Sequence, residues 1–195
     1  MTDLHTIILN QVTPGERVID VGCGDGQLLQ KLRDEKNCEA YGIEKNTHHV
    51  LTAMQQGIPI FQGDGLEGIR PFEDGAFDLA ILSQTLQQVM DPCQLLRELC
   101  RVANRVIVTF PNFAHWRVRW HLLVHGVSPK TRELPHDWHN TPNIRVITIK
   151  EFRRLCQRES IHIMNDIPLV SVGWRFPLIL TNFFTKKGIF ILCRS

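Results

Sequence analysis

The feature that most constrains the fold is a run of three glycines in the segment Gly22-Cys23-Gly24-Asp25-Gly26. An apolar run at residues 17–21 precedes this segment, and a leucine-rich helical pattern at residues 27–35 follows it. Glycine lets a backbone turn sharply and lets a ligand approach closely, so the segment predicts a strand-to-helix turn that binds a cofactor. Considered alone, the motif also fits a strand-to-helix turn that binds nothing.

Strand and helix patterns alternate over the first 110 residues. Short runs rich in Val and Ile, typical of buried parallel strands, occupy residues 17–21, 38–43, 58–62, 77–82 and 105–110. Helical spacing of apolar residues occupies residues 27–35, 47–56 and 92–102. A capping box at residues 148–151 begins a further helix that continues to residue 158, and residues 161–164 and 189–193 predict closing strands. Repeated strand-helix units predict an open parallel sheet covered on both faces.

The alternation stops at residue 110. Residues 111–143 contain three of the four tryptophans and five of the nine histidines, with little strand character. We interpret this segment as an insertion that either caps the cofactor or forms a docking surface, because it begins at the edge where α/β folds bind ligands. The alternative is an amphipathic helix that buries Trp116 and Trp120 and leaves its arginines in water. At 195 residues and 43% hydrophobic, the chain is expected to form one domain over residues 1–195.

The acids around the glycine loop indicate the charge of the ligand. Asp20 precedes the loop, Asp25 lies inside it, and the Gly-x-Gly-x-Gly spacing differs from the spacing of dinucleotide folds. Carboxylates at this position would repel a pyrophosphate. A cofactor with an ammonium and a sulfonium group fits better, because Asp20 can accept from the ammonium directly or through water.

Two further acids follow the next two predicted strands. Glu44 is placed to bind both ribose hydroxyls, and Asp64 is placed to bind an adenine amino group, with Gly65 and Leu66 against the ring. Taken singly, Glu44 also fits a solvated acid beside Lys45, and Asp64 fits an ordinary turn aspartate. Because consecutive parallel strands end at one edge of a sheet, we expect these carboxylates and the glycine loop to surround a single adenosyl ligand.

At this point the chain resembles class I S-adenosylmethionine-dependent methyltransferases, in which the glycine loop, the two later acids and the Phe77-Asp78-Leu79-Ala80 strand follow in the same order. This resemblance implies a Rossmann-like α/β fold with a mostly parallel seven-stranded sheet and a helical insertion after the fifth strand. More specifically, the chain resembles the MetW family of methionine-biosynthesis proteins. Segments typical of that family are Ser83-Gln84-Thr85-Leu86-Gln87, Val108-Thr109-Phe110-Pro111-Asn112-Phe113 with His115-Trp116-Arg117, and Trp138 followed by Thr141-Pro142-Asn143-Ile144.

The resemblance implies that the chain binds S-adenosylmethionine, or S-adenosylhomocysteine as the product. The residues expected to contact the cofactor are Asp20, Gly22, Cys23, Gly24, Glu44, Asp64, Gly65, Leu66 and Ser83. The resemblance also implies a role as an ancillary partner of homoserine O-acyltransferase, the enzyme that activates homoserine. It names no methyl acceptor, so an active methyltransferase acting on an unidentified small molecule or protein is the alternative.

Several histidines and one cysteine are candidates for catalytic or metal-binding roles. Methyl transfer needs a general base only where the acceptor carries a proton. Candidates for that base are His115, His136 and His139, each of which also fits a hydrogen-bonded surface or lid histidine. His121 and His125 have helical i, i+4 spacing, but no third ligand is indicated, so we expect no metal site. Cys23 is expected to pack within the loop and not to act as a nucleophile.

Composition argues against several classes of partner. Basic and acidic side chains number 22 and 20, which gives no extended electrostatic surface for nucleic acid or an anionic membrane. Six scattered cysteines form no Cys-x-x-Cys pair and suit a reducing compartment. The N-terminus lacks a signal-peptide pattern, and no run of about 18 apolar residues occurs. We therefore expect a cytoplasmic protein without nucleic-acid or membrane partners.

Overall fold

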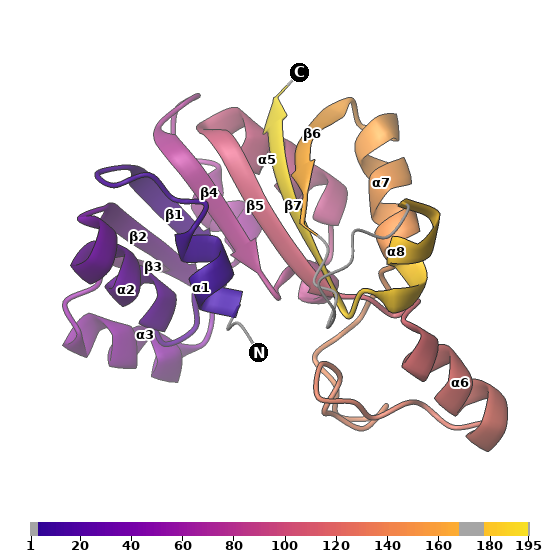
Figure 1. Cartoon of the computed structure of the whole chain (residues 1–195). Helices are drawn as coiled ribbons and strands as arrows, with labels where there is room; N and C mark the ends of the chain where they lie inside the picture. Colours follow the sequence, from indigo (N-terminus) through magenta and orange to yellow (C-terminus); the bar gives the residue numbers. More distant parts are fainter. Residues whose placement is uncertain (1–3, 168–177, 195) are drawn as a thin grey trace.

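The computed structural model describes residues 4–167 and 178–194, which form a seven-stranded sheet in the order β3-β2-β1-β4-β5-β7-β6 (Figure 1). The strands are β1 Arg17–Val21, β2 Glu39–Glu44, β3 Ile60–Gln62, β4 Phe77–Ser83, β5 Ala103–Pro111, β6 Ile161–Asp166 and β7 Lys187–Arg194. Strand β7 runs antiparallel to β5 and β6, and the remaining neighbours pair in parallel. The mostly parallel seven-stranded sheet predicted from the sequence is confirmed.

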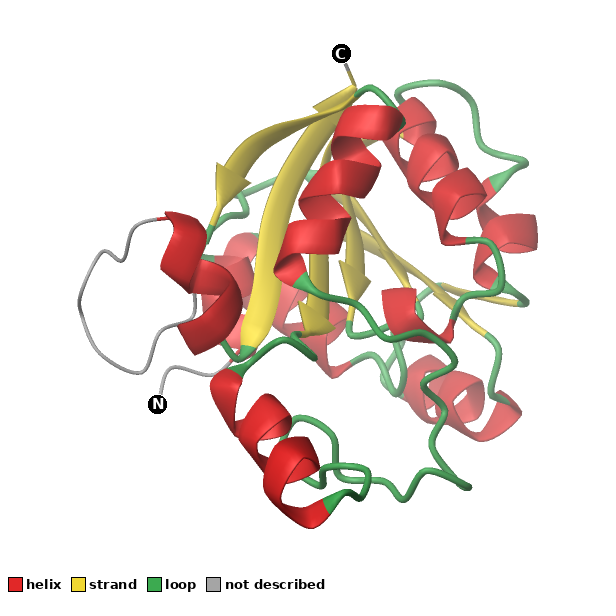
Figure 2. Cartoon of the chain, turned by 90° about the vertical axis from the view of Figure 1, so that its right-hand side faces the viewer, coloured by secondary structure: helices red, strands yellow, loops and turns green. Residues whose placement is uncertain are grey.

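Helices cover both faces of the sheet (Figures 1 and 2). They are α1 Leu4–Leu9, α2 Gln27–Lys36, α3 Thr47–Gln55, α4 Gly65–Ile69, the 3-10 helix η1 Leu86–Gln88, α5 Pro92–Val102, α6 Trp116–His125, α7 Ile149–Arg158 and α8 Leu178–Phe184. Within the described part of the chain, no helix has both the length and the apolar character needed to cross a bilayer.

Side chains of each central strand alternate between two apolar cores. In β4, Leu79 and Ile81 pack with buried residues of α1, α2 and α3, whereas Ala80 and Leu82 pack with buried residues of α5 and α7. A strand that contributes to both cores must be apolar at almost every position, which explains why the parallel strands appear as continuous apolar runs in the sequence.

Most bounds of the predicted elements lie within about two residues of those observed, but α1, α4, η1 and α8 were not predicted. Asp64 is the N-cap of α4, and its Oδ1 accepts from the backbone N–H of Leu66 at 3.0 Å. The spacing of Asp64 and Glu67 matches an N-cap followed by an acid three residues later, a signal that could have indicated this helix.

Helix α6 extends away from the sheet, and a long irregular segment joins it to α7 (Figures 1 and 2). Within residues 111–143, α6 is the only helix, and residues 126–143 contain turns and bends without helix or strand. Trp116 and Trp120 are 38% and 60% exposed, so the alternative that buries both tryptophans in the core is wrong. The segment instead presents large apolar side chains to solvent.

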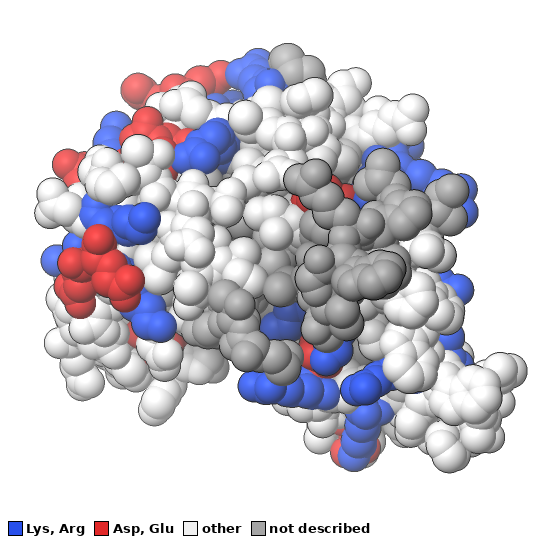
Figure 3. Space-filling model, viewed as in Figure 1, with Lys and Arg blue, Asp and Glu red and all other residues white. Residues whose placement is uncertain are grey.

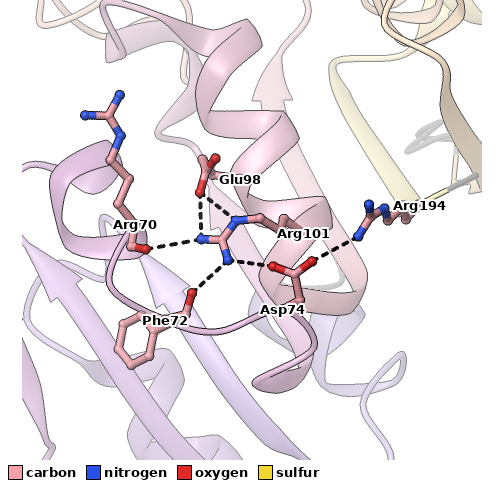
Figure 4. Close-up of polar contacts among 6 residues, drawn as sticks. All are labelled: Arg70, Phe72, Asp74, Glu98, Arg101 and Arg194. Atoms are coloured by element: carbon pink, nitrogen blue, oxygen red, sulfur yellow. Dashed lines mark hydrogen bonds and ion pairs between the residues drawn. The ribbon is translucent and has the colours of Figure 1, made fainter.

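A hydrogen-bond network around Arg101 ties the connection before β4 to the end of α5 (Figure 4). Its guanidinium donates to the carbonyls of Phe72 and Arg70 at 2.8 and 3.2 Å and to the carboxylates of Glu98 and Asp74 at 2.7 and 2.9 Å. Arg194 at the end of β7 joins through a 3.3 Å contact with Asp74. These contacts lie at the amino edge of the parallel strands, opposite the edge where the predicted ligand site lies.

Candidate cofactor-binding site

The glycine loop turns tightly between β1 and α2, with positive φ angles of 76°, 58° and 81° at Gly22, Gly24 and Gly26. The N–H of Gly22 donates to the carbonyl of Ile43 at 2.7 Å, which fixes the loop beside the end of β2. A Cβ on Gly22 would lie 2.5 Å from Oγ1 of Thr85, whereas a Cβ on Gly24 would meet nothing within 4 Å. Gly22 is therefore required by packing, and Gly24 borders open space.

Glu44, the last residue of β2, is held by backbone donors on both carboxylate oxygens. Oε2 accepts from the N–H of Gly24 at 2.9 Å, and Oε1 accepts from the N–H of Asn46 at 2.7 Å. Asn46 in turn caps α3, because its Oδ1 accepts from the N–H groups of His48 and His49. The carboxylate thus has a fixed orientation directly beside the glycine loop.

A strained residue follows β4. Gln84 has a φ of 56°, which a side chain other than glycine adopts at a cost of about 1–3 kcal/mol. Its N–H lies 3.0 Å from the carbonyl and 3.1 Å from Oγ1 of the buried Thr109, and Ser83 Oγ lies 3.3 Å from the same hydroxyl. Such strain, held by surrounding hydrogen bonds, is typical of functional sites and orients the polar loop that Ser83 begins.

A cavity of about 470 Å³, here called the glycine-loop cavity, opens at this edge of the sheet. Of the residues predicted to contact a cofactor, it brings together Gly22, Gly24, Glu44, Asp64, Gly65, Leu66 and Ser83. The cavity is also lined by residues that were not predicted from the sequence, among them His49, Gln88 and Pro142. The Asn46 N-cap beside Glu44 could have indicated His49, whereas no local signal indicates Pro142, which comes from the segment after β5.

Asp20 does not line the glycine-loop cavity but is buried at the end of β1, with 2% of its surface exposed. Its Oδ1 is buried without a hydrogen-bond partner. Burial, and secondarily the negative charge of Glu44, raise the pKa of this carboxyl to about 7. A buried carboxylate oxygen without a hydrogen-bond partner is costly, and a cationic ligand group would remove that cost.

Cys23 is buried in the loop and is absent from the described lining of the cavity. Its Sγ lies 2.6 Å from the position that a Cβ on Gly42 would occupy, so the thiol packs against β2. Burial, together with the charge of Asp20, raises the pKa of the thiol far above its ordinary value. The neutral thiol is a poor nucleophile.

The three histidines proposed as general bases lie elsewhere. His115 is buried and caps α6, with Nδ1 accepting from the N–H of Arg117 at 3.3 Å, whereas His136 and His139 are exposed. None of the three is among the described lining residues of the glycine-loop cavity. The rings of His121 and His125 are 4.7 Å apart, and the described residues include no group of three or more His, Cys, Asp or Glu suited to a metal ion.

Several solved structures with this architecture are methyltransferases. An S-adenosylmethionine-dependent methyltransferase from Mesorhizobium loti has a TM-score of 0.69 at 16% identity, covering 97% of each chain. Magnesium protoporphyrin IX methyltransferase from Synechocystis, solved with bound S-adenosylhomocysteine, has a TM-score of 0.63 at 18% identity, covering 97% of this chain and 78% of that one. The fold is that of the Rossmann-like S-adenosylmethionine-dependent methyltransferases.

Sequence similarity places the chain in a particular family within this fold. The model of the family described as methionine biosynthesis protein MetW matches residues 2–192, and the chain belongs to this family. The bifunctional methionine biosynthesis protein MetXA/MetW of Rhodopirellula baltica is 37% identical over 169 residues, which are 82% of this chain and 27% of the relative. The chain spans less than half the length of this and other relatives that it matches.

Proposed function

We propose that this chain binds S-adenosylmethionine and acts as an ancillary subunit of homoserine O-acyltransferase in methionine biosynthesis. The observation that carries the cofactor assignment is the glycine-loop cavity, which Gly24, Glu44 and Asp64 line together, just after the Asp20 side chain whose buried Oδ1 has no hydrogen-bond partner. We place this function in the cytoplasm, where a reducing environment keeps the six free cysteines as thiols.

The residues present fit the cofactor. Asp20 would accept from its ammonium group, directly or through water, and Glu44 would accept from the ribose hydroxyls with the lone pairs left after its two backbone contacts. Asp64 would accept from the adenine amino group. The N–H of Leu66 already donates to Asp64, so we assign the side chain of Leu66 to the adenine face. The bound cofactor would supply an electrophilic methyl group on its sulfonium.

Replacing Glu44 with alanine is expected to weaken binding of S-adenosylmethionine at least about 100-fold. Two hydrogen bonds to a charged group are lost, each contributing about 1.5–3 kcal/mol. Isothermal titration with S-adenosylmethionine and S-adenosylhomocysteine measures this change. Glu39→Ala is the matched control, because Glu39 begins the same strand at the opposite edge and is exposed. Absence of binding to the unmodified chain would overturn the cofactor assignment.

Two observations support the partner assignment. The relative described as the bifunctional methionine biosynthesis protein MetXA/MetW joins two named proteins on one chain, and fusion of this kind favours association of the separate proteins. Helix α6 and the residue after its C-terminal turn expose an apolar surface, here called the α6 surface. Its residues are Trp116, Trp120, Leu122, Leu123, Val124 and Val127. Large exposed apolar side chains that include tryptophan are typical of protein interfaces.

Changing Leu123 to lysine is expected to weaken association with purified homoserine O-acyltransferase at least about tenfold, because a charge replaces the apolar side chain of the α6 surface that is 79% exposed. Co-purification and the rate of acyl transfer report the loss. Met54→Lys, on the exposed side of α3, is the matched control. If the unmodified chain neither associates with the acyltransferase nor changes its rate, the partner assignment is wrong.

The alternative is an active methyltransferase, favoured by the polar side chains of Ser83, Gln84, Thr85 and Gln88 in the lining of the glycine-loop cavity. These groups would orient an acceptor, and methyl transfer needs little beyond such positioning. Cofactor labelled in its methyl group distinguishes the two functions. Label that reaches a metabolite or protein of a cell extract supports the transferase, and tight cofactor binding without transfer counts against it.

A further inference from the structure

A second cavity, of about 410 Å³, lies at the carboxyl end of β5 and is here called the β5-end cavity. Its walls come from the end of β5, from α6, from residues 130–134 and from Lys186 just before β7. None of its described lining residues belongs to the glycine-loop cavity. It is therefore a separate compartment with a size suited to a small molecule.

The described lining of the β5-end cavity carries four basic side chains and one acidic side chain, Glu133. The basic residues are Arg117, Lys130, Arg132 and Lys186. Figure 3 shows lysine and arginine side chains gathered on the lower part of the molecule, beside the segment that contains α6. Lys130 is paired with Asp137 at 2.6 Å. Lys186 is partly buried and forms no ion pair with any described residue, so its charge is available to a ligand.

Most polar atoms in the wall are already satisfied. Nδ2 of Asn112 donates to the carbonyls of Asn182 and Thr185 at 3.0 and 2.7 Å, and Oγ1 of Thr131 accepts from the N–H of Leu134 at 3.1 Å. Nδ1 of His121 differs, because it is buried without a hydrogen-bond partner. An unsatisfied buried nitrogen is costly, and a ligand that bonds to it would explain its place in the wall.

The positive charge of the cavity comes from its lysines and arginines and not from His115. Burial, and secondarily the charge of Lys186, hold the pKa of His115 below its ordinary value; Glu133 opposes this shift and Arg117 adds to it. The imidazole is therefore neutral near pH 7. Lys186 and Arg117 both line the cavity, and neither forms an ion pair with a described residue. Cationic side chains of this kind favour an anionic ligand.

We propose that the β5-end cavity binds a small organic anion, with a carboxylate or phosphate group on Lys186 and Arg117 and an apolar portion against the buried Val118 and Leu134. Cationic side chains hold the charged end, and buried apolar side chains supply the contact area for the rest of the molecule. This site is independent of the cofactor and partner assignments above.

The test uses benzoate and phenyl phosphate, which share a small apolar ring and differ in the anionic group, with benzyl alcohol as the neutral analogue. Isothermal titration at constant ionic strength is expected to show binding of at least one anion and none of the alcohol. Lys186→Met is expected to weaken that binding at least tenfold. Lys36→Met is the matched control, since Lys36 is also partly buried but lies at the end of α2. Whichever of benzoate and phenyl phosphate binds more tightly then shows whether the cavity prefers a carboxylate or a phosphate group.

Three results would overturn the proposal: neither anion binds, the alcohol binds as well as the anions, or both lysine variants weaken binding equally. Equal weakening by both lysine variants would mean that the anions bind through the general positive charge of the surface and not in this cavity. Titration of Lys186→Met with S-adenosylmethionine is expected to match the unmodified chain, which separates this test from the cofactor assignment. If Lys186→Met does not fold, Arg117→Met tests the same charge from α6, because Arg117 is exposed and forms no ion pair with a described residue.

Discussion

Replacing Asp20 with asparagine is expected to stabilise the ligand-free protein at pH 8 while abolishing cofactor binding. The carboxyl is buried and its pKa is raised from 3.8 to about 7, so the folded chain retains a proton that the unfolded chain loses. The protonated Asp20 therefore contributes to the free energy of unfolding fully below about pH 4, and this contribution is lost as the pH rises through about 7. The loss amounts to as much as about 4 kcal/mol, and asparagine, which stays neutral, avoids it.

Thermal unfolding from pH 4 to pH 8 measures this stabilisation. The melting temperature of Asp20→Asn is expected to exceed that of the unmodified chain by about 10 °C at pH 8, with the difference vanishing near pH 4. Asp25→Asn is the matched control, because Asp25 lies in the same loop and bonds to Gln27 outside the described lining of the cavity. Equal melting temperatures at pH 8 would show that Asp20 is not a destabilising carboxylate.

Cofactor binding tests the second half of the same prediction. An ammonium group favours the ionised carboxylate, so binding to the unmodified chain is expected to release a proton near pH 6 and to weaken up to tenfold for each pH unit below about 7. Titrations in two buffers of different ionisation enthalpy count the released protons. The Asp20→Asn variant lacks the carboxylate, so tight binding of S-adenosylmethionine by this variant would contradict the proposal that Asp20 binds the ammonium group.

Much of the site could be predicted because its residues stand at the ends of strands. Periodicity located β1, β2 and β4, and parallel strands necessarily bring their carboxyl ends to one edge. The contact between Glu44 and the N–H of Gly24 follows directly from that arrangement. The burial of Asp20 beneath the loop did not follow, because the sequence alone does not show how the turn of the glycine loop covers the end of β1.

Features that depend on distant segments could not be predicted. Pro142 reaches the cavity because the N–H groups of Ile144 and Arg145 donate to the carbonyl of Gln87 at 3.0 and 3.1 Å, a tertiary contact without a local signal. The exposure of Trp120 could not be predicted either. Helix α6 has apolar residues on several sides, so its sequence does not indicate which side packs, and the helix extends away from the sheet. His115, His136 and His139 likewise could not be placed from the sequence, and none of them is among the described lining residues of the glycine-loop cavity.

The largest effect on binding with the smallest change in structure is expected from Gly24→Ala. A Cβ at this position meets no atom of the protein within 4 Å, so the methyl group would point into open space beside the glycine-loop cavity. Gly15→Ala is the matched control, because Gly15 also has a positive φ, 82° against 58°, and also has no atom within 4 Å of the added Cβ. Each variant is expected to lose about 1–2 kcal/mol of stability through backbone strain.

Only Gly24→Ala is expected to weaken S-adenosylmethionine binding, by at least about 100-fold, because the methyl group would occupy the space where the backbone must approach the ligand. Gly15→Ala, in the turn before β1, is expected to bind within twofold of the unmodified chain. The comparison of the two titrations removes the shared strain, so any remaining difference comes from the added methyl group at the cavity. Equal binding by both variants would place the cofactor away from Gly24, since a ligand packed against that residue has no room for another carbon atom.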